Sequence, residues 1–179
     1  MIKKNIRRQL RKTLFQLSNT DRQLREQRLI SYIHQFLLKW QICQVAVYYP
    51  IHAEPRLDWD LLAADLYFPK VKQTGLIFVR ASQKECILHA KMSVPEPVVD
   101  HPVIDLSQNT LMLVPGLAFS VSGYRIGYGQ GFYDRFLKQC GPNTRFVGLS
   151  FFAPENKIPN ASHDIALDYC VTPKNSYTF

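Results

Sequence analysis

The sequence contains few cysteines and no long apolar run. Its four cysteines are spread along the chain without a Cys-x-x-Cys pair, so neither a zinc site nor a disulfide framework is expected. No apolar run reaches the roughly 20 residues that a membrane-spanning helix needs. The basic start of the chain also lacks the apolar centre of a signal peptide. We therefore expect a soluble, cytoplasmic protein with reduced and mostly buried thiols, and no membrane partner.

Acidic residues are scarce in the first part of the chain. Residues 1–28 contain nine Lys or Arg against two acidic residues, whereas the remainder has thirteen against twelve. The net charge of +8 is thus concentrated in one segment. It indicates either a solvated helix face or a surface that contacts nucleic-acid phosphates. The segment has no nucleic-acid motif, and aromatic residues are not interleaved with the basic run of its first helix, so no nucleic-acid partner is expected.

The spacing of apolar residues predicts two helices at the start of one domain that covers residues 1–179. A length of 179 residues with 46% hydrophobic and 20% charged residues suits one globular domain with its own core. Ile6, Leu10 and Leu14 recur every four residues and predict a helix from Ile2 to about Gln16. N-cap candidates at 18–20 then begin a second helix that extends to about Leu38. Its core-facing residues are Leu29, Ile33, Phe36 and Leu37.

The remaining patterns predict an α/β fold with three layers, αβα, around a mostly parallel sheet. A helix is expected at 58–66, with Asp58 as its N-cap. Pro69 should confine its strand to a sheet edge or to the first residues of a strand, because proline cannot donate a ladder hydrogen bond. The predicted strands are Gln44–Tyr49, Phe68–Val71, Leu76–Val79, Cys86–His89, Leu111–Val114, Phe146–Phe152 and a last one near Tyr169–Thr172.

A glycine-rich stretch follows the apolar run at 111–114. Glycines at 127, 129 and 131 leave the backbone free to follow a tight path, so several N–H groups can converge on anionic oxygens. The pattern after Gly131 is helical, and strand, glycine loop and helix together indicate a phosphate site. Arg125 and Asp134 flank the loop with a guanidinium and a carboxylate suited to a metal. The glycine spacing matches neither a P-loop nor a Rossmann fingerprint.

These residues resemble the signature of the 5-formyltetrahydrofolate cyclo-ligase family. The matching segments are PGLAF at 115–119 and GYRIGYGQGFYD at 123–134, supported by KKNIR at 3–7 and YYPIHAE at 48–54. The resemblance covers nearly the whole chain. It implies an enzyme that uses ATP and Mg²⁺ to convert 5-formyltetrahydrofolate into 5,10-methenyltetrahydrofolate, with release of ADP and phosphate. It further implies a monomer with a small-molecule substrate.

The resemblance also implies a role for each site residue. Arg125 would be catalytic, as the group that stabilises the transferring phosphoryl group. Asp134 and Asp164 would hold the magnesium ion, although a His-Asp pair such as 163–164 by itself is typical of a local turn. ATP would contact Lys3, Lys4, Arg7, Arg125, Gly127, Gly129, Gln130, Gly131 and Tyr133, and the folate Tyr49, Glu54, Tyr128 and Phe132.

Glu54 has one interpretation from its position in the sequence and another from the family resemblance. Its position in a loop after a strand indicates, by itself, an exposed carboxylate. The resemblance instead implies contact with the pterin ring, and a carboxylate suits that task because it can accept two hydrogen bonds from neighbouring N–H donors. Tyr128 and Gln130 depart from the family, since some members carry Arg and Lys there.

Two alternatives remain open from the sequence. The chain could be a binding module in which the basic helix contacts nucleic acid or an acidic surface and the glycine loop is only a turn. It could also be an ATP-using ligase that acts on another small acid.

Overall fold

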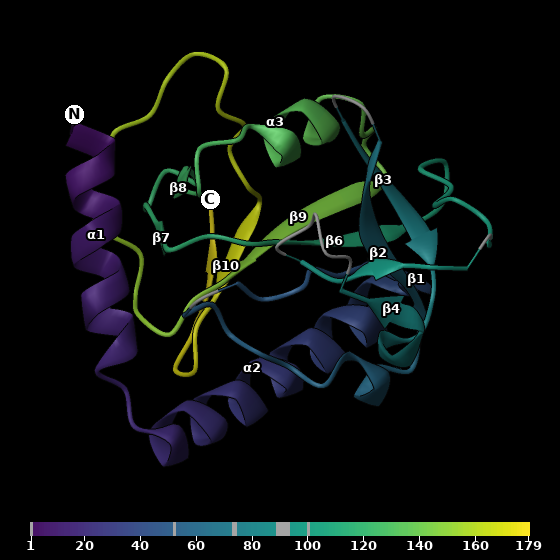
Figure 1. Ribbon diagram of the computed structural model, residues 1–179, viewed down its shortest axis with the longest axis horizontal. Helices are drawn as coiled ribbons and strands as arrows, with labels where there is room; N and C mark the ends of the chain where they lie inside the picture. Colours follow the sequence, from purple (N-terminus) through teal and green to yellow (C-terminus); the bar gives the residue numbers. More distant parts are fainter. Residues whose placement is uncertain (1, 52, 73–74, 89–93, 100) are drawn as a thin grey trace.

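The computed structural model describes residues 2–51, 53–72, 75–88, 94–99 and 101–179, without the side chains of residues 2 and 3. One seven-stranded sheet runs through it, in the order β11-β10-β9-β6-β1-β2-β3 (Figure 1). The strands from β10 to β2 run parallel, and the two edge strands are antiparallel to their neighbours. Their bounds are β1 Gln44–Ala46, β2 Asp65–Lys72, β3 Gly75–Arg80, β6 Thr110–Val114, β9 Thr144–Leu149, β10 Tyr169–Val171 and β11 Ser176–Thr178. This confirms the predicted α/β class and mostly parallel sheet.

Helices cover both faces of the sheet. Along β6, Leu111 and Leu113 pack in one hydrophobic cluster and Met112 and Val114 in another, because neighbouring strand residues point to opposite faces. The first cluster includes the four predicted core residues of helix α2 (Asn19–Trp40), and the second includes two residues of helix α3 (Phe132–Leu137). Burying each such Leu or Phe contributes about 1.5–3 kcal/mol. The layers are therefore α, β and α, as the pattern predicts (Figure 1).

Helix α1 (Ile2–Phe15) lies at one side of the molecule, next to the small antiparallel pair β7 (Ala118–Phe119) and β8 (Arg125–Ile126) (Figure 1). Leu14 anchors it in the core, with 4% of its surface exposed. Ser18 then caps α2, where its Oγ accepts a hydrogen bond from the Asp21 N–H at 3.1 Å. Both N-terminal helices thus form where predicted. Within the described residues, none of the helices combines the length and the apolar character needed to cross a lipid bilayer.

The helix predicted at 58–66 is wrong. Only one 3₁₀ turn forms, at Trp59–Leu61, and Asp65 already belongs to β2. Trp59 is fully buried and donates from its indole N–H to the Tyr48 carbonyl at 3.0 Å, so the segment folds around this side chain. Asp58 makes no cap hydrogen bond with its side chain. Tertiary packing of one aromatic residue therefore overrides the local helical pattern.

The restriction expected from Pro69 is also wrong, because β2 is an internal strand. Pairing between β1 and β2 ends at Tyr67, whose carbonyl accepts from Val47 N–H. By strand alternation, the Pro69 nitrogen faces the same side, beyond the end of β1. No ladder hydrogen bond is lost there, so proline is tolerated in the middle of β2.

The segment PGLAF packs through its phenylalanine. The Phe119 ring lies directly over Gly116 and Gly148, so closely that a Cβ at Gly148 would overlap it. Glycine at these two positions lets the β7–β8 pair approach the sheet. Two further strands, β4 (Cys86–Ile87) and β5 (Glu96–Pro97), form a separate pair after a second 3₁₀ turn, Gln83–Glu85.

Candidate active site

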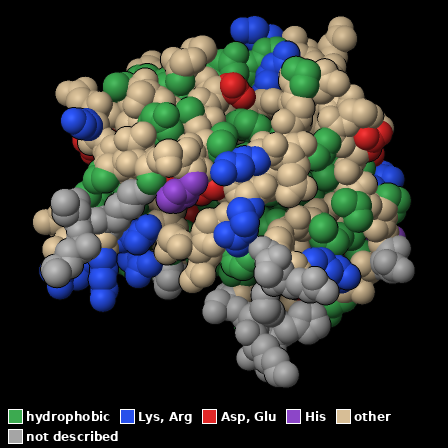
Figure 2. All heavy atoms as spheres, turned by 90° about the horizontal axis from the view of Figure 1, so that it is seen from above, with side chains coloured by type: hydrophobic (Ala, Val, Ile, Leu, Met, Phe, Trp, Pro, Cys, Tyr) green, Lys and Arg blue, Asp and Glu red, His purple; other side chains and the backbone are tan. Residues whose placement is uncertain are grey.

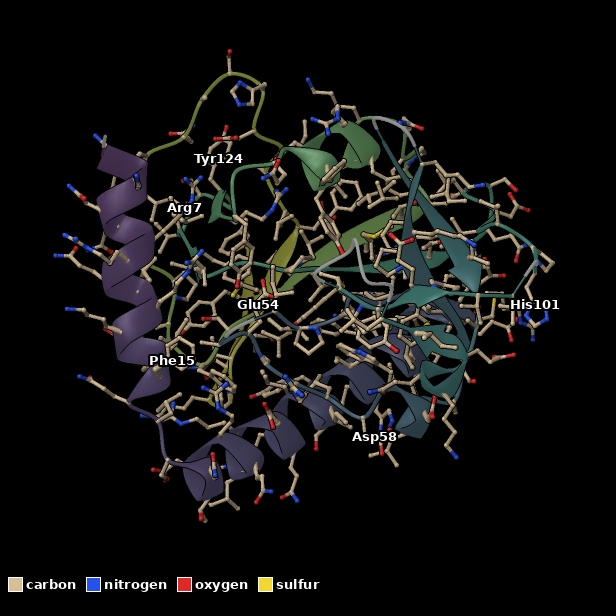
Figure 3. All side chains as sticks on the ribbon, viewed as in Figure 1. Arg7, Phe15, Glu54, Asp58, His101 and Tyr124 are labelled. Atoms are coloured by element: carbon tan, nitrogen blue, oxygen red, sulfur yellow. The ribbon has the colours of Figure 1, made fainter. Side chains whose placement is uncertain are left out.

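A cavity of about 770 Å³ opens where the loops after β1 and β6 leave the sheet. Those loops follow the carboxyl ends of parallel strands, where open α/β sheets place their ligands. The volume lies in the range of small-molecule sites. Figure 3 shows Arg7 and Glu54 on the side near α1, whereas Asp58 and His101 lie at the periphery.

The cavity gathers thirteen of the fifteen predicted site residues. All of them line it except Lys3 and Lys4. Lys4 is exposed on α1, and the side chain of Lys3 lies outside the described part of the structure. Residues from the chain start to Asp164 are therefore brought to one place. Their individual roles stay predictions.

The glycine loop is fixed by a side chain from α1. Gly129 and Gly131 have φ angles of +95° and +66°, a left-handed conformation that favours glycine. The Arg7 Nε donates to the Gly127 carbonyl at 2.7 Å, and the Arg7 guanidinium would lie only 2.9 Å from a Cβ at Gly129. Arg7 therefore crosses the loop and brings a positive charge to the cavity wall.

Arg125 forms a buried ion pair on the same wall. Its Nη2 donates to Asp134 Oδ1 at 2.9 Å, and its Nη1 to the Ile165 carbonyl at 3.2 Å. The exposed fractions of the Arg125 and Asp134 side chains are 6% and 18%. The Ile165 N–H donates to the same Asp134 oxygen at 3.2 Å. Arg125 thus connects β8, α3 and the segment that contains Asp164.

Asp164 stands in a local turn and also faces the cavity. Its Oδ2 accepts from the Ala161 N–H at 2.8 Å, and its own N–H donates to the Ala161 carbonyl at 3.0 Å. The His163 Nε2 lies 3.7 Å from Asp164 Oδ1. Both aspartates line the cavity, so the turn and the site are compatible.

The two aspartates fit a magnesium ion by their chemistry. Mg²⁺ prefers oxygen ligands and is held by one or two carboxylates together with phosphate oxygens and waters. One oxygen of Asp134 is occupied by Arg125 and Ile165. The described residues contain no group of three or more His, Cys, Asp or Glu suited to a metal, so a cation here would depend on phosphate oxygens as well.

Glu54 is buried, so its interpretation as an exposed loop carboxylate is wrong. Only 2% of the residue is exposed, and its Oε2 accepts from the Ile51 N–H at 3.0 Å. Its Oε1 is buried without a hydrogen-bond partner among the described residues. Burial raises the pKa of Glu54 to about 8, although the Ile51 N–H opposes this shift. A buried carboxylate oxygen without a donor is suited to a ligand that brings an N–H group.

Tyrosines surround Glu54. Burial raises the pKa values of Tyr128 and Tyr133 above their ordinary value, and the Glu54 charge adds to the effect. The Tyr128 hydroxyl donates to the Ile51 carbonyl at 2.9 Å, and the Tyr49 hydroxyl to the Gln83 carbonyl at 2.7 Å. These phenols stay neutral hydrogen-bond donors over the physiological pH range.

Comparison with known proteins identifies the family. A sequence profile of the 5-formyltetrahydrofolate cyclo-ligase family matches residues 1–173. The chain belongs to this family. The 5-formyltetrahydrofolate cyclo-ligase of Escherichia coli K12 is 32% identical over 102 residues, 55% of this chain and 56% of the relative. The mitochondrial cyclo-ligase of Arabidopsis thaliana is 28% identical over 135 residues, 60% of this chain and 47% of the relative. The chain thus spans about half the length of these cyclo-ligases.

The structural match to the family covers more of the chain than the sequence matches to these two relatives. The NMR structure of Aquifex aeolicus 5,10-methenyltetrahydrofolate synthetase superposes with a TM-score of 0.82 at 29% identity. The match covers 99% of this chain and 93% of that one. Family membership and the three-layer fold therefore rest on independent comparisons.

Several residues of this cyclo-ligase cavity were not predicted. Glu96, on β5, lines it and accepts the Val71 N–H at 2.9 Å. His163 also lines it. Glu96 lies between two prolines, and the sequence around it has no spacing that would place it at the cavity. That position depends on how β5 lies against β2, which is a long-range contact.

Proposed function

We propose that the chain is an ATP- and Mg²⁺-dependent 5-formyltetrahydrofolate cyclo-ligase that forms 5,10-methenyltetrahydrofolate. The observation that carries the proposal is the composition of one cavity. It has a buried carboxylate oxygen to which none of the described residues donates, and it also has a glycine loop with two arginines and two aspartates. Membership of the family supports the same conclusion.

Glu54 and its neighbours would bind the folate. The pterin ring of a folate carries adjacent amino and ring N–H groups, which match the two oxygens of one carboxylate. The Oε1 of Glu54 is ready to accept, whereas Oε2 already accepts from Ile51. Binding of N–H donors favours the ionised carboxylate, so Glu54 would release its proton as the ligand binds. Tyr49, Tyr128 and Phe132 would contact the rest of the ring system.

The glycine loop would bind the nucleotide. Its backbone N–H groups, with Arg7 across them, can neutralise phosphate oxygens. Lys3, Lys4, Gln130 and Tyr133 would complete this half of the site. Asp134 and Asp164 would hold Mg²⁺, which would neutralise phosphate charge when bound.

The reaction needs positioning more than a protein nucleophile. The formyl oxygen attacks the γ-phosphorus of ATP, and ADP leaves. Nitrogen 10 of the folate then attacks the activated formyl carbon, the carbon–oxygen bond to phosphate breaks, and the nitrogen loses its proton. Arg125, held by Asp134, would stabilise the transferring phosphoryl group through its charge.

A second candidate function rests on the outer face of α1. Lys4, Arg8 and Lys12 are exposed there at intervals of four residues. Lys and Arg side chains gather at the left of Figure 2, where α1 lies. This surface could bind nucleic acid. The binding would weaken steeply with salt and need no turnover of ATP.

The test is an absorbance assay for the methenyl product after 5-formyltetrahydrofolate, ATP and Mg²⁺ are mixed with the protein. We expect product formation that requires ATP, and a loss of at least about 100-fold in Asp134→Asn and Arg125→Ala. Asp58→Asn makes the same chemical change as Asp134→Asn, but at an exposed position outside the cavity, and should retain activity.

Failure of the wild-type protein to form product would contradict the proposed substrate. Unchanged turnover in Arg125→Ala would refute the catalytic role of that residue alone. Salt-sensitive RNA binding without product would favour the second candidate.

A further inference from the structure

Two arginines of α1 contact adjacent residues of the glycine loop. Arg7 donates to the Gly127 carbonyl at 2.7 Å. One turn later, the Arg11 guanidinium carbon lies 5.3 Å from the centre of the Tyr128 ring, a cation–π contact. Arg11 is absent from the residues that line the cavity, so it supports Tyr128 from outside. Helix α1 therefore fixes the loop backbone through Arg7 and a side chain of that loop through Arg11.

Tyr128 also contacts the half of the cavity that is proposed to bind the folate. Its hydroxyl donates to the Ile51 carbonyl at 2.9 Å. The N–H of the same Ile51 donates to Glu54 Oε2 at 3.0 Å. Tyr128 and Glu54 thus hold one residue by its two backbone groups. A shift of the Tyr128 hydroxyl must move Ile51 or break one of these hydrogen bonds.

Arg22, on α2, makes a second connection between α1 and the loop that contains Glu54. Its Nη2 donates to the Leu14 carbonyl at 2.9 Å, in the last turn of α1. Its Nη1 donates to the Ala53 carbonyl at 3.2 Å, next to Glu54. Helix α1 is therefore connected to the segment around Glu54 at two separate places, through Tyr128 of the glycine loop and through Arg22.

Resting on the proposed function, we infer that Tyr128 and Arg11 are positioning residues through which nucleotide binding at the glycine loop raises the affinity for the folate at Glu54. Phosphate groups bound by Arg7 and the loop N–H groups would restrict residues 127–131, which include three glycines with a high conformational freedom. The loss of conformational entropy in the loop then accompanies binding of the first ligand. The second ligand binds to a loop that is already ordered, so its binding loses less entropy. The effect must be reciprocal, so the folate raises the nucleotide affinity by the same factor.

Tyr128 also lines the cavity, so a direct contact with the folate has to be separated from this coupling. Loss of a direct contact weakens folate binding equally with and without nucleotide. Loss of coupling changes the ratio of the two affinities. The ratio is therefore the quantity to measure, because a purely structural role does not alter it.

The experiment is calorimetric titration of the full-length protein with 5-formyltetrahydrofolate. It is performed without nucleotide and with a saturating ATP analogue that carries a β,γ-imido bridge, in the presence of Mg²⁺. In the wild type we expect the analogue to tighten folate binding at least about fivefold, within the usual range of coupling between sites. In Tyr128→Phe, which keeps the ring and removes only the hydroxyl, the factor should fall to within about twofold of unity. Arg11→Gln should lower it in the same direction.

Arg8→Gln is the matched control, because Arg8 is an exposed arginine on the same helix. Its coupling factor should equal that of the wild type. A wild-type factor near unity, or an undiminished factor in both Tyr128→Phe and Arg11→Gln, would overturn the inference while both ligands still bind. A wild-type protein that binds neither ligand would overturn the proposed function, and the inference with it.

Discussion

At the scale of single residues, the chemistry of the site follows from burial. Glu54 and Arg125 are both charged residue types with less than a tenth of their surface exposed. The charge of Arg125 is balanced by Asp134, whose Oδ1 lies 2.9 Å from the guanidinium. Burial disfavours the charged form of Glu54 and raises its pKa to about 8, and among the described residues one backbone donor, the Ile51 N–H, opposes this shift. The two residues show that a buried charge needs a partner, and that an acid without one binds a proton instead.

The raised pKa of Glu54 predicts how stability depends on pH. The folded protein holds a proton that an unfolded Glu, with a pKa of 4.5, has released. This contribution is complete below pH 4.5 and is lost as the pH rises to 8 and above. Glu54→Gln copies the protonated form, so the free energy of unfolding of the variant minus that of the wild type should increase by a few kcal/mol between pH 5 and 9.

Urea denaturation at several pH values measures this difference. Glu155→Gln makes the same chemical change at an exposed carboxylate and is the matched control. A constant difference for Glu54→Gln would show that the carboxylate is ionised in the folded protein.

At the scale of elements, the glycine loop depends on backbone conformation and on α1 together. Gly129 combines a positive φ with the Arg7 guanidinium against its missing side chain. Gly127 has neither feature, since its φ is not positive and a Cβ there would contact none of the described residues within 4 Å. Gly129 therefore has a structural reason to be glycine that Gly127 lacks.

We predict that Gly129→Ala lowers the free energy of unfolding by about 1–3 kcal/mol, the cost of a strained conformation for a residue with a side chain. It should also raise the KM for ATP, because Arg7 is displaced from the loop. Gly127→Ala should change the free energy of unfolding by less than about 0.5 kcal/mol. Denaturation curves and ATP titrations of both variants measure these effects, and equal destabilisation by the two substitutions would contradict the argument.

At the scale of the whole molecule, the cavity is assembled from segments far apart in the chain. Arg7, Glu54, Glu96 and Asp164 come from helix α1, the loop after β1, strand β5 and the segment before β10. The parallel sheet brings these segments together at one end. A ligand that contacts all of them connects the beginning and the end of the chain.

Ligand binding should therefore raise the melting temperature. One ligand at 100 times its Kd adds about 2.7 kcal/mol of stability, which corresponds to about 5–10 °C for a chain of this size. We predict this shift for 5-formyltetrahydrofolate and for the non-hydrolysable ATP analogue with Mg²⁺. When both ligands are present together, the shift should exceed the sum of the two separate shifts. Thermal scans measure it. If neither ligand shifts the melting temperature, the cavity does not bind them.

Local sequence patterns were sufficient to predict much of the secondary structure of this protein. The apolar spacing determined α1, the core face of α2 and the buried strands, and the glycine motif determined the loop and the start of α3. These features could be predicted because each depends on residues within a few positions of one another. The family motifs added the grouping of the site residues, which the cavity then brought together.

Only the tertiary structure decided what depends on distant contacts. It packed Trp59 against Tyr48 and so replaced a predicted helix with one turn. It also buried Glu54 with one oxygen that has no hydrogen-bond partner in the described part of the chain. It also paired Arg125 with Asp134 and placed the Arg11 guanidinium against the Tyr128 ring. The physical reason is the same in each case. Desolvation and packing depend on which segments meet in space, and the spacing of residues along the chain does not specify this.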